Sequence, residues 1–144
     1  MSDSLKLLAQ SAEDLTVMSS LMQDATVRTG DIDFTPSAHR LTFVANRFRW
    51  EKKRKFFRPK GERVRTGLHM NGILKVQAQG LDLSAKDEVL DLLSMEAHEN
   101  GEAFDILLNF AGGATLKLTA ECVDAAMADL TEGWEALARP HHTD

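Results

Sequence analysis

The sequence contains a single cysteine, no tyrosine and no long run of apolar residues. One cysteine, Cys122, cannot form a disulfide within the chain, which excludes a disulfide-stabilised scaffold and suits a reducing compartment. The longest apolar runs are a few residues, far short of the roughly 20 that a membrane-spanning helix needs. The first ten residues lack a basic stretch followed by an apolar core, so we predict no secretory signal and a cytoplasmic location.

The length and composition are those of one globular domain. The chain has 144 residues, of which 43% are apolar and 27% are charged, enough to bury a core but short for two domains. We place the domain at 1–134 and predict a flexible tail over 135–144. The tail contains His141 and His142, but two adjacent histidines without further ligands do not make a shaped metal site, and we predict no metal or cofactor.

Hydrophobic periodicity predicts a mainly antiparallel α+β domain. Leu5 and Leu7 alternate with Lys6 as in a strand, and Ser11 then caps a predicted helix with apolar residues at helical spacing. After this helix, apolar residues recur two apart in most of the chain, which is typical of strands with one buried face. The predicted extended segments are seven, at 25–34, 40–50, 63–70, 73–79, 89–99, 103–110 and 114–119.

Turn chemistry and a final periodic segment complete the predicted fold. Asn71-Gly72 favours a type I′ hairpin between the two strands that flank it, and Gly112-Gly113 favours another hairpin turn. A closing helix is predicted from Thr119 to Gly133, with Val123, Ala126, Met127 and Leu130 as its apolar stripe. Seven antiparallel strands and one C-terminal helix match the pleckstrin-homology (PH) arrangement. We therefore predict a PH-like β-sandwich or half-barrel with an extra N-terminal strand and helix.

The motifs "GDIDF", "NRFRW", "RTGLHM", "NFAGGATLKLTAEC" and "ADLTEGW" together resemble an uncharacterised bacterial family, catalogued as a domain of unknown function. The resemblance extends from about Leu5 to Trp134. Its motifs correspond to strands, turns and a helix, and the family offers no activity, cofactor or site residue to transfer. The resemblance implies one compact domain over nearly the whole chain.

Positive charge is concentrated in one stretch, which we call the basic segment (residues 47–65, "RFRWEKKRKFFRPKGERVR"). It holds ten of the 17 Lys and Arg residues against Glu51 and Glu62, a net +8. Since the whole chain carries −5, all other residues together carry −13. Pro59 and Gly61 break regular structure inside the segment. A protein that is acidic elsewhere thus has one strongly cationic connection between two predicted strands.

Rings alternate with these cations, as on surfaces that bind single-stranded nucleic acid, where cations follow phosphates and rings stack on bases. An acidic protein is an equally suitable partner, and an anionic membrane surface is a less favoured one. Another possibility is that Phe48 and Trp50 belong to the core, returned to it by a bulge near Asn46, and that the charges only solvate a turn. The predicted contact residues are Arg49, Lys52, Lys53, Arg54, Lys55, Phe56, Phe57, Arg58 and Lys60.

No catalytic constellation is recognisable in the sequence, so we favour a non-catalytic binding or interaction module. Cys122 is expected at the first turn of the closing helix as a small buried residue, since Glu121 and Asp124 disfavour a thiolate. The alternative is a small enzyme or ligand-binding protein whose pocket gathers dispersed residues. Self-association, with the basic segment of one copy on the acidic surface of another, is also open. The residues for such a pocket are Asp31, His39, His69, His98 and Cys122.

Overall fold

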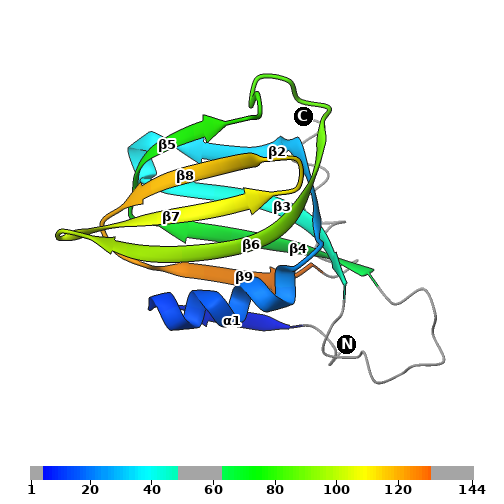
Figure 1. Cartoon of the computed structure of the whole chain (residues 1–144). Helices are drawn as coiled ribbons and strands as arrows, with labels where there is room; N and C mark the ends of the chain where they lie inside the picture. The colour runs from blue at the N-terminus through cyan, green and yellow to red at the C-terminus, as the bar shows by residue number, and fades with distance from the viewer. Residues whose placement is uncertain (1–4, 49–62, 131–144) are drawn as a thin grey trace.

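The computed structural model describes residues 5–48 and 63–130, which form antiparallel strands and one α-helix (Figure 1). The mainly antiparallel α+β prediction is confirmed, and each of the seven predicted extended segments corresponds to a strand, the second of them over its described part, Arg40–Phe48. Within these ranges no helix is long and apolar enough to cross a membrane. The elements are β1 (Lys6–Ala9), α1 (Ala12–Met22), β2 (Thr26–Thr35), a 3-10 turn η1 (Pro36–Ala38), β3 (Arg40–Phe48), β4 (Arg63–Asn71), β5 (Ile73–Gln79), β6 (Val89–Asn100), β7 (Ala103–Phe110), β8 (Ala114–Ala120) and β9 (Ala125–Asp129).

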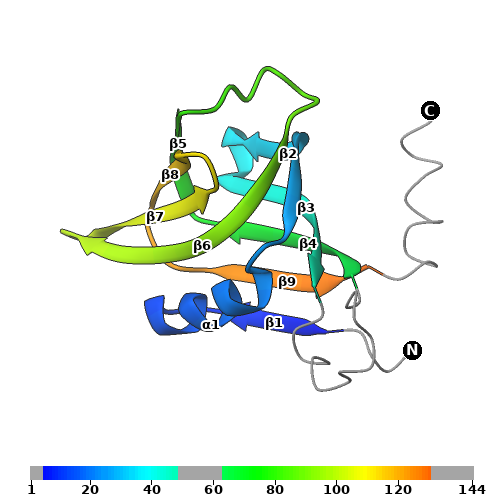
Figure 2. The same cartoon turned by 45° about the vertical axis from the view of Figure 1, so that its right-hand side comes forward.

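The strands form one sheet in the order β1-β9-β4-β3-β2-β6-β7-β8-β5, with every pair antiparallel. Two strands bend and continue into the next strand. Strand β4 leads into β5 through Gly72, and β8 leads into β9 through residues 121–124. Because β4 pairs with β9 and β5 pairs with β8, the sheet closes on itself. Figures 1 and 2 show the resulting strong curvature, with the β6–β7 hairpin extending beyond the rest.

The hairpin predicted at Asn71-Gly72 is wrong. Gly72 does have the expected positive φ of 76°, but the backbone here is hydrogen-bonded to the turn between β8 and β9. Asn71 N donates to Asp124 O at 2.8 Å, and Glu121 N donates to Gly72 O at 2.9 Å. The glycine therefore bends one long strand instead of reversing the chain. By contrast, Gly112 and Gly113, with φ of 84° and 83°, form the predicted turn between β7 and β8.

The predicted closing helix is also wrong over the described residues, because its central part is strand β9. The strand lies between β1 and β4, so both of its edges are hydrogen-bonded. Ala125, Met127 and Asp129 alternate into the core, while the intervening alanines face outward. Paired backbone on both sides outweighs the helix propensity of an alanine-rich stretch. The described chain thus has nine strands and no helix after β8, and its strand count differs from the seven-stranded PH arrangement.

The core fills the inside of the curved sheet, and α1 covers one side of it. Ser11 caps α1 as predicted, its Oγ accepting a hydrogen bond from Asp14 N at 3.0 Å. The helix packs against β6 and β1, where Ser19 Oγ accepts from Met95 N at 2.8 Å. Its apolar stripe closes the core with the fully buried side chains of Leu15, Met18 and Met22.

Strand β2 is held at an irregular point by the loop before β6. Its pairing with β3 shifts register between Val27 and Ile32, and at that point Thr29 N and Gly30 N donate to Glu88 O and Lys86 O at 2.8 and 2.9 Å. A Cβ atom on Gly30 would lie 2.7 Å from Lys86 O, closer than real Cβ contacts. Glycine is therefore required here by the approach of another backbone.

We expect Gly30→Ala to lower the free energy of unfolding by about 1–3 kcal/mol, because the loop must move to admit a methyl group. Urea unfolding measures the loss. Gly67→Ala is the matched control, since a Cβ on this mid-strand glycine makes an ordinary 3.5 Å contact with Leu130. Equal stability of the two variants would contradict the proposed role of Gly30.

Candidate functional site

The predicted contact residues of the basic segment, Arg49 to Lys60, lie outside the described residues, as do the proposed tail and domain end. The structure does describe the two strands from which the segment extends. Strands β3 and β4 pair without interruption from Arg40↔Asn71 to Phe48↔Arg63. The predicted bulge near Asn46 is therefore wrong: the irregularity is in β2 instead. We call the end of this β3–β4 pair, at residues 46–48 and 63–65, the hairpin stem of the basic segment.

Arg47, at the start of the basic segment, points into the core and is fully buried. Its Nε and Nη2 donate to Oδ1 and Oδ2 of Asp129 at 3.1 and 2.9 Å, a two-pronged ion pair, and Nη1 donates to Phe48 O at 2.9 Å. Such a planar pairing of guanidinium and carboxylate is strong and directional. Arg47 is thus neutralised within the chain and cannot belong to a contact surface.

Asp129 uses its remaining acceptor capacity on two further strands. Thr66 Oγ1 donates to Oδ1 at 2.9 Å, and Leu5 N donates to Oδ2 at 3.1 Å. The carboxylate therefore joins β3, β4 and the start of β1 to its own strand. This network holds the base of the hairpin stem from the inside, and because the side chains of Arg47, Thr66 and Asp129 are buried it is a structural feature.

The outward face of the same stem is cationic. Arg63 lies over the ring of Phe48, with the guanidinium carbon 3.9 Å from the ring centre, and its Nη1 donates to Asn46 O at 3.0 Å. Phe48 is therefore half-buried beneath an arginine on the outer face and does not reach the core. Arg65 follows on the same face, exposed and two residues further along β4.

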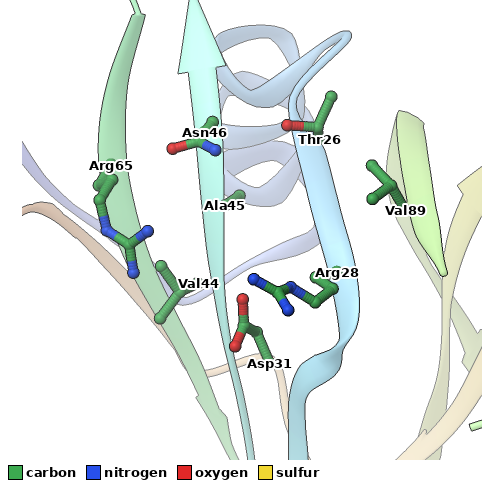
Figure 3. Close-up of a pocket in the computed structure, with 8 residues that line it drawn as sticks. All are labelled: Thr26, Arg28, Asp31, Val44, Ala45, Asn46, Arg65 and Val89. Carbon is green, nitrogen blue, oxygen red and sulfur yellow. The ribbon is translucent and has the colours of Figure 1, made fainter. Parts of the chain in front are cut away.

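A hollow of about 300 Å³ lies on this outer face across β2, β3 and β4. Figure 3 shows Arg28 and Asp31 directed toward each other from β2, with Asn46 on β3 and Arg65 on β4. Arg65 is opposite Asn46 in the sheet register, and Asn46 is opposite Thr26. Two guanidinium groups, a carboxylate, a hydroxyl and an amide thus border a concave surface where the basic segment begins and ends. We call this the polar hollow.

A second hollow of about 310 Å³ adjoins the first and shares Asp31 and Val44 with it. It extends over β3, β4 and β9, where Gly67 has no side chain and Ala128 has only a methyl group. Gly67 lies beside Val44 on one strand and Ala128 on the other. Small residues side by side leave a depression, and its border is mainly apolar. We call this the apolar hollow.

Sequence reasoning missed Arg28 and the hollows. The alternation of Thr66, Leu68 and Met70 already indicates that Arg65 and His69 face outward, as the structure confirms. No local signal places Arg28 beside Arg65, because that requires β3 to pair with both β2 and β4. The depression likewise depends on Gly67 and Ala128 meeting from strands far apart in sequence.

The three histidines of the predicted pocket occupy separate parts of the sheet. His39 follows η1, His69 is on β4, and His98 is on β6, where its Nε2 lies 2.8 Å from Glu96 Oε1. The bond with His98, and then one from Asn109, lowers the pKa of the Glu96 carboxyl. Asp31 and His69 both border the apolar hollow, but within the described chain they form no hydrogen bond or ion pair with each other. They do not make an acid–base pair.

Cys122 is in the turn between β8 and β9 and is exposed, so the prediction of a buried helical residue is wrong. Desolvation of the thiol raises its pKa, and the carboxylates of Asp124 and Glu121 raise it further. A thiol that stays protonated is a poor nucleophile. Across residues 5–48 and 63–130, no group of three or more His, Cys, Asp or Glu side chains could hold a metal ion.

Comparisons with known proteins give a family without an activity. A sequence family described as "Protein of unknown function (DUF2948)" matches residues 5–142. No curated protein matches the chain. A solved structure, of an uncharacterised protein from Neisseria gonorrhoeae, is similar with a TM-score of 0.43 and 13% sequence identity, over 84% of this chain and 96% of that one.

Proposed function

The chain belongs to this family of proteins of unknown function, and from its own residues we propose that it is a non-catalytic binding module for an anionic partner. The contact surface is the basic segment without Arg47, together with the outer face of its stem. The partner is an acidic protein or a nucleic acid. The observation that carries this proposal is the position of two cations of the segment, Arg63 and Arg65, on the outer face of the stem, where Arg65 borders the polar hollow together with Arg28 from β2.

Charge segregation supports the proposal. The basic segment carries a net +8 by sequence, and the burial of Arg47 against Asp129 removes one of its cations. Arg28, which the segment does not include, adds one cation on the stem face, and Asp31 beside it adds one anion. The rest of the chain is acidic and repels an anionic partner, so contact must be local. At about 0.1 M salt, charges act over roughly 10 Å, which restricts the attraction to this part of the surface.

The concave stem face also supports a binding surface over a merely solvated turn. Exposed cations on a turn need no defined neighbours, whereas Arg28 and Arg65 border one hollow with the polar side chains of Thr26 and Asn46. Guanidinium groups bind carboxylates and phosphates through two parallel hydrogen bonds. Amide and hydroxyl groups nearby can donate to the same anion. We propose a non-catalytic role because the histidines lie apart from one another and the raised pKa of the Cys122 thiol disfavours the thiolate.

Binding is expected to weaken steeply as salt rises. We expect fluorescence anisotropy to detect binding of at least one labelled anion among single-stranded RNA, single-stranded DNA and an acidic peptide. Affinity for an oligonucleotide should fall about a hundredfold or more between about 50 and 200 mM salt, because several bound phosphates release counterions. Anionic vesicles are the fourth probe, and light scattering at each salt concentration detects self-association. The proposal is overturned if none of the three probes binds at low salt.

A further inference from the structure

The two hollows form one continuous surface with two chemistries. Outward residues lie in rows across the strands: Thr26, Asn46 and Arg65 in one row, Val44, Gly67 and Ala128 in the next. The first row borders the polar hollow and the second borders the apolar hollow. Leu130, on the far side, closes the apolar hollow over Gly67. A molecule that covers both must have an anionic part and an apolar part next to each other.

We infer that the paired hollows bind an acidic polypeptide segment that carries an aliphatic side chain beside its carboxylates. This inference rests on the proposed function and selects one of its two partner classes. The carboxylates face Arg28 and Arg65, and the aliphatic side chain enters the depression between Val44, Gly67 and Leu130. Further carboxylates of the segment are complementary to Arg63, which lies on the same outer face of the stem.

Asp31 is the residue that favours a polypeptide. It borders both hollows, so its carboxylate lies where any occupant passes from one to the other. A carboxylate accepts hydrogen bonds and repels anions. A polypeptide has a backbone N–H to donate at each residue except proline, and it can place its own carboxylates elsewhere. A nucleic-acid strand carries a phosphate at every nucleotide, and the donor on its backbone is the 2′-hydroxyl, which RNA has and DNA lacks.

Among the described residues, the borders of the hollows offer few rings on which bases could stack: the imidazole of His69 is exposed at the apolar hollow. Phe43 contributes to the border of the apolar hollow, but it is a core residue that is only 2% exposed. The other apolar groups that the structure describes there are aliphatic. Bases bind single-strand surfaces mainly by stacking on aromatic side chains, whereas aliphatic depressions accept side chains such as leucine. The charge and the shape of the two hollows therefore favour a peptide over a nucleic-acid strand.

Two labelled acidic peptides, identical except that one has leucine where the other has serine, test the inference on the full chain. We expect the leucine peptide to bind about tenfold more tightly, since burial of one leucine side chain is worth that factor or more. Gly67→Leu fills the apolar hollow and should remove this difference, so that the two peptides bind the variant with equal affinity. Arg28→Glu should weaken both peptides, whereas Lys75→Glu, an equal charge change on β5, should weaken neither beyond a small general effect.

Several outcomes would overturn the inference and leave the proposed function standing. These are equal affinity for the two peptides, a leucine preference that survives Gly67→Leu, and tighter binding of a single-stranded oligonucleotide than of either peptide. Asp31→Asn provides a further arm, and it should improve oligonucleotide binding more than peptide binding. A dimer that Gly67→Leu dissociates would instead identify a second copy of this chain as the occupant. Failure of every anion to bind would overturn the proposed function itself.

Discussion

Asp129→Ala is expected to lower the free energy of unfolding by about 3–5 kcal/mol, with a fall in Tm of about 10–20 °C. The substitution leaves the fully buried Arg47 guanidinium without the carboxylate that now binds it at 3.1 and 2.9 Å. It also removes the acceptor of Thr66 Oγ1 and Leu5 N. Four parts of the sheet lose their common connection at once. Thermal and urea unfolding followed by circular dichroism measure the effect.

The double variant Arg47→Met, Asp129→Leu separates the cost of an unpaired charge from the value of the pair. Replacing both partners with apolar residues of similar volume leaves no buried charge, so most of the lost stability should return. Recovery is incomplete because the Thr66 hydroxyl still lacks its acceptor. Asp33→Ala, at an exposed aspartate on β2, is the control and should change stability by less than about 0.5 kcal/mol. A loss below about 1 kcal/mol in Asp129→Ala would contradict the structural role of the ion pair.

Reversal of Lys53, Arg54 and Lys55 to glutamate is expected to reduce affinity for an anionic probe by about a hundredfold or more at low salt. Three reversals change the local charge by six, which turns the net +8 of the basic segment into +2. Because attraction to a polyanion depends on the number of cations that meet it, both the affinity and its salt dependence should fall. Anisotropy titrations of wild type and variant across a salt series measure both quantities.

A control of equal charge change tests whether location matters. Arg40, Lys75 and Lys117 are exposed on β3, β5 and β8, and Arg40 is at the opposite end of its strand from the basic segment. Their reversal to glutamate gives the same net charge as the first variant. If the two triple variants lose affinity equally, net charge governs binding and the basic segment is not a specific surface. Unfolding curves of both variants establish that the fold is retained.

The relation between sequence and fold is clearest at Arg47. Alternation along β3 places Leu41, Phe43 and Ala45 on one face, and position 47 is next on that face. Arginine usually prefers solvent, and the basic segment counts Arg47 among its ten cations, although Arg47 is not one of the predicted contact residues. The structure resolves this conflict through Asp129, a residue 82 positions away. Local pattern was sufficient to find the face of Arg47, and only the partner from β9 shows why a charge can occupy it.

Two other errors have the same origin. Gly72 has the positive φ that a type I′ turn needs, but the predicted hairpin does not form. Whether a bend reverses the chain or turns a corner depends on which strands are beside it, and here they are β8 and β9. In β9 itself, an alanine-rich stretch suits a helix in isolation. It becomes a strand because β1 and β4 supply hydrogen bonds on both sides.

By itself, the sequence determined the seven central strands, the capped helix α1, the turn at Gly112-Gly113 and the segregation of positive charge. Each of these follows from the spacing or composition of residues that are close together in the sequence, so it can be predicted without knowing the tertiary structure. Only the tertiary structure decided the closure of the sheet, the ninth strand, the burial of Arg47 and the paired hollows beside Arg28 and Gly67. These depend on which strands become neighbours, because periodicity specifies the face of a side chain and leaves its partner across the sheet unspecified.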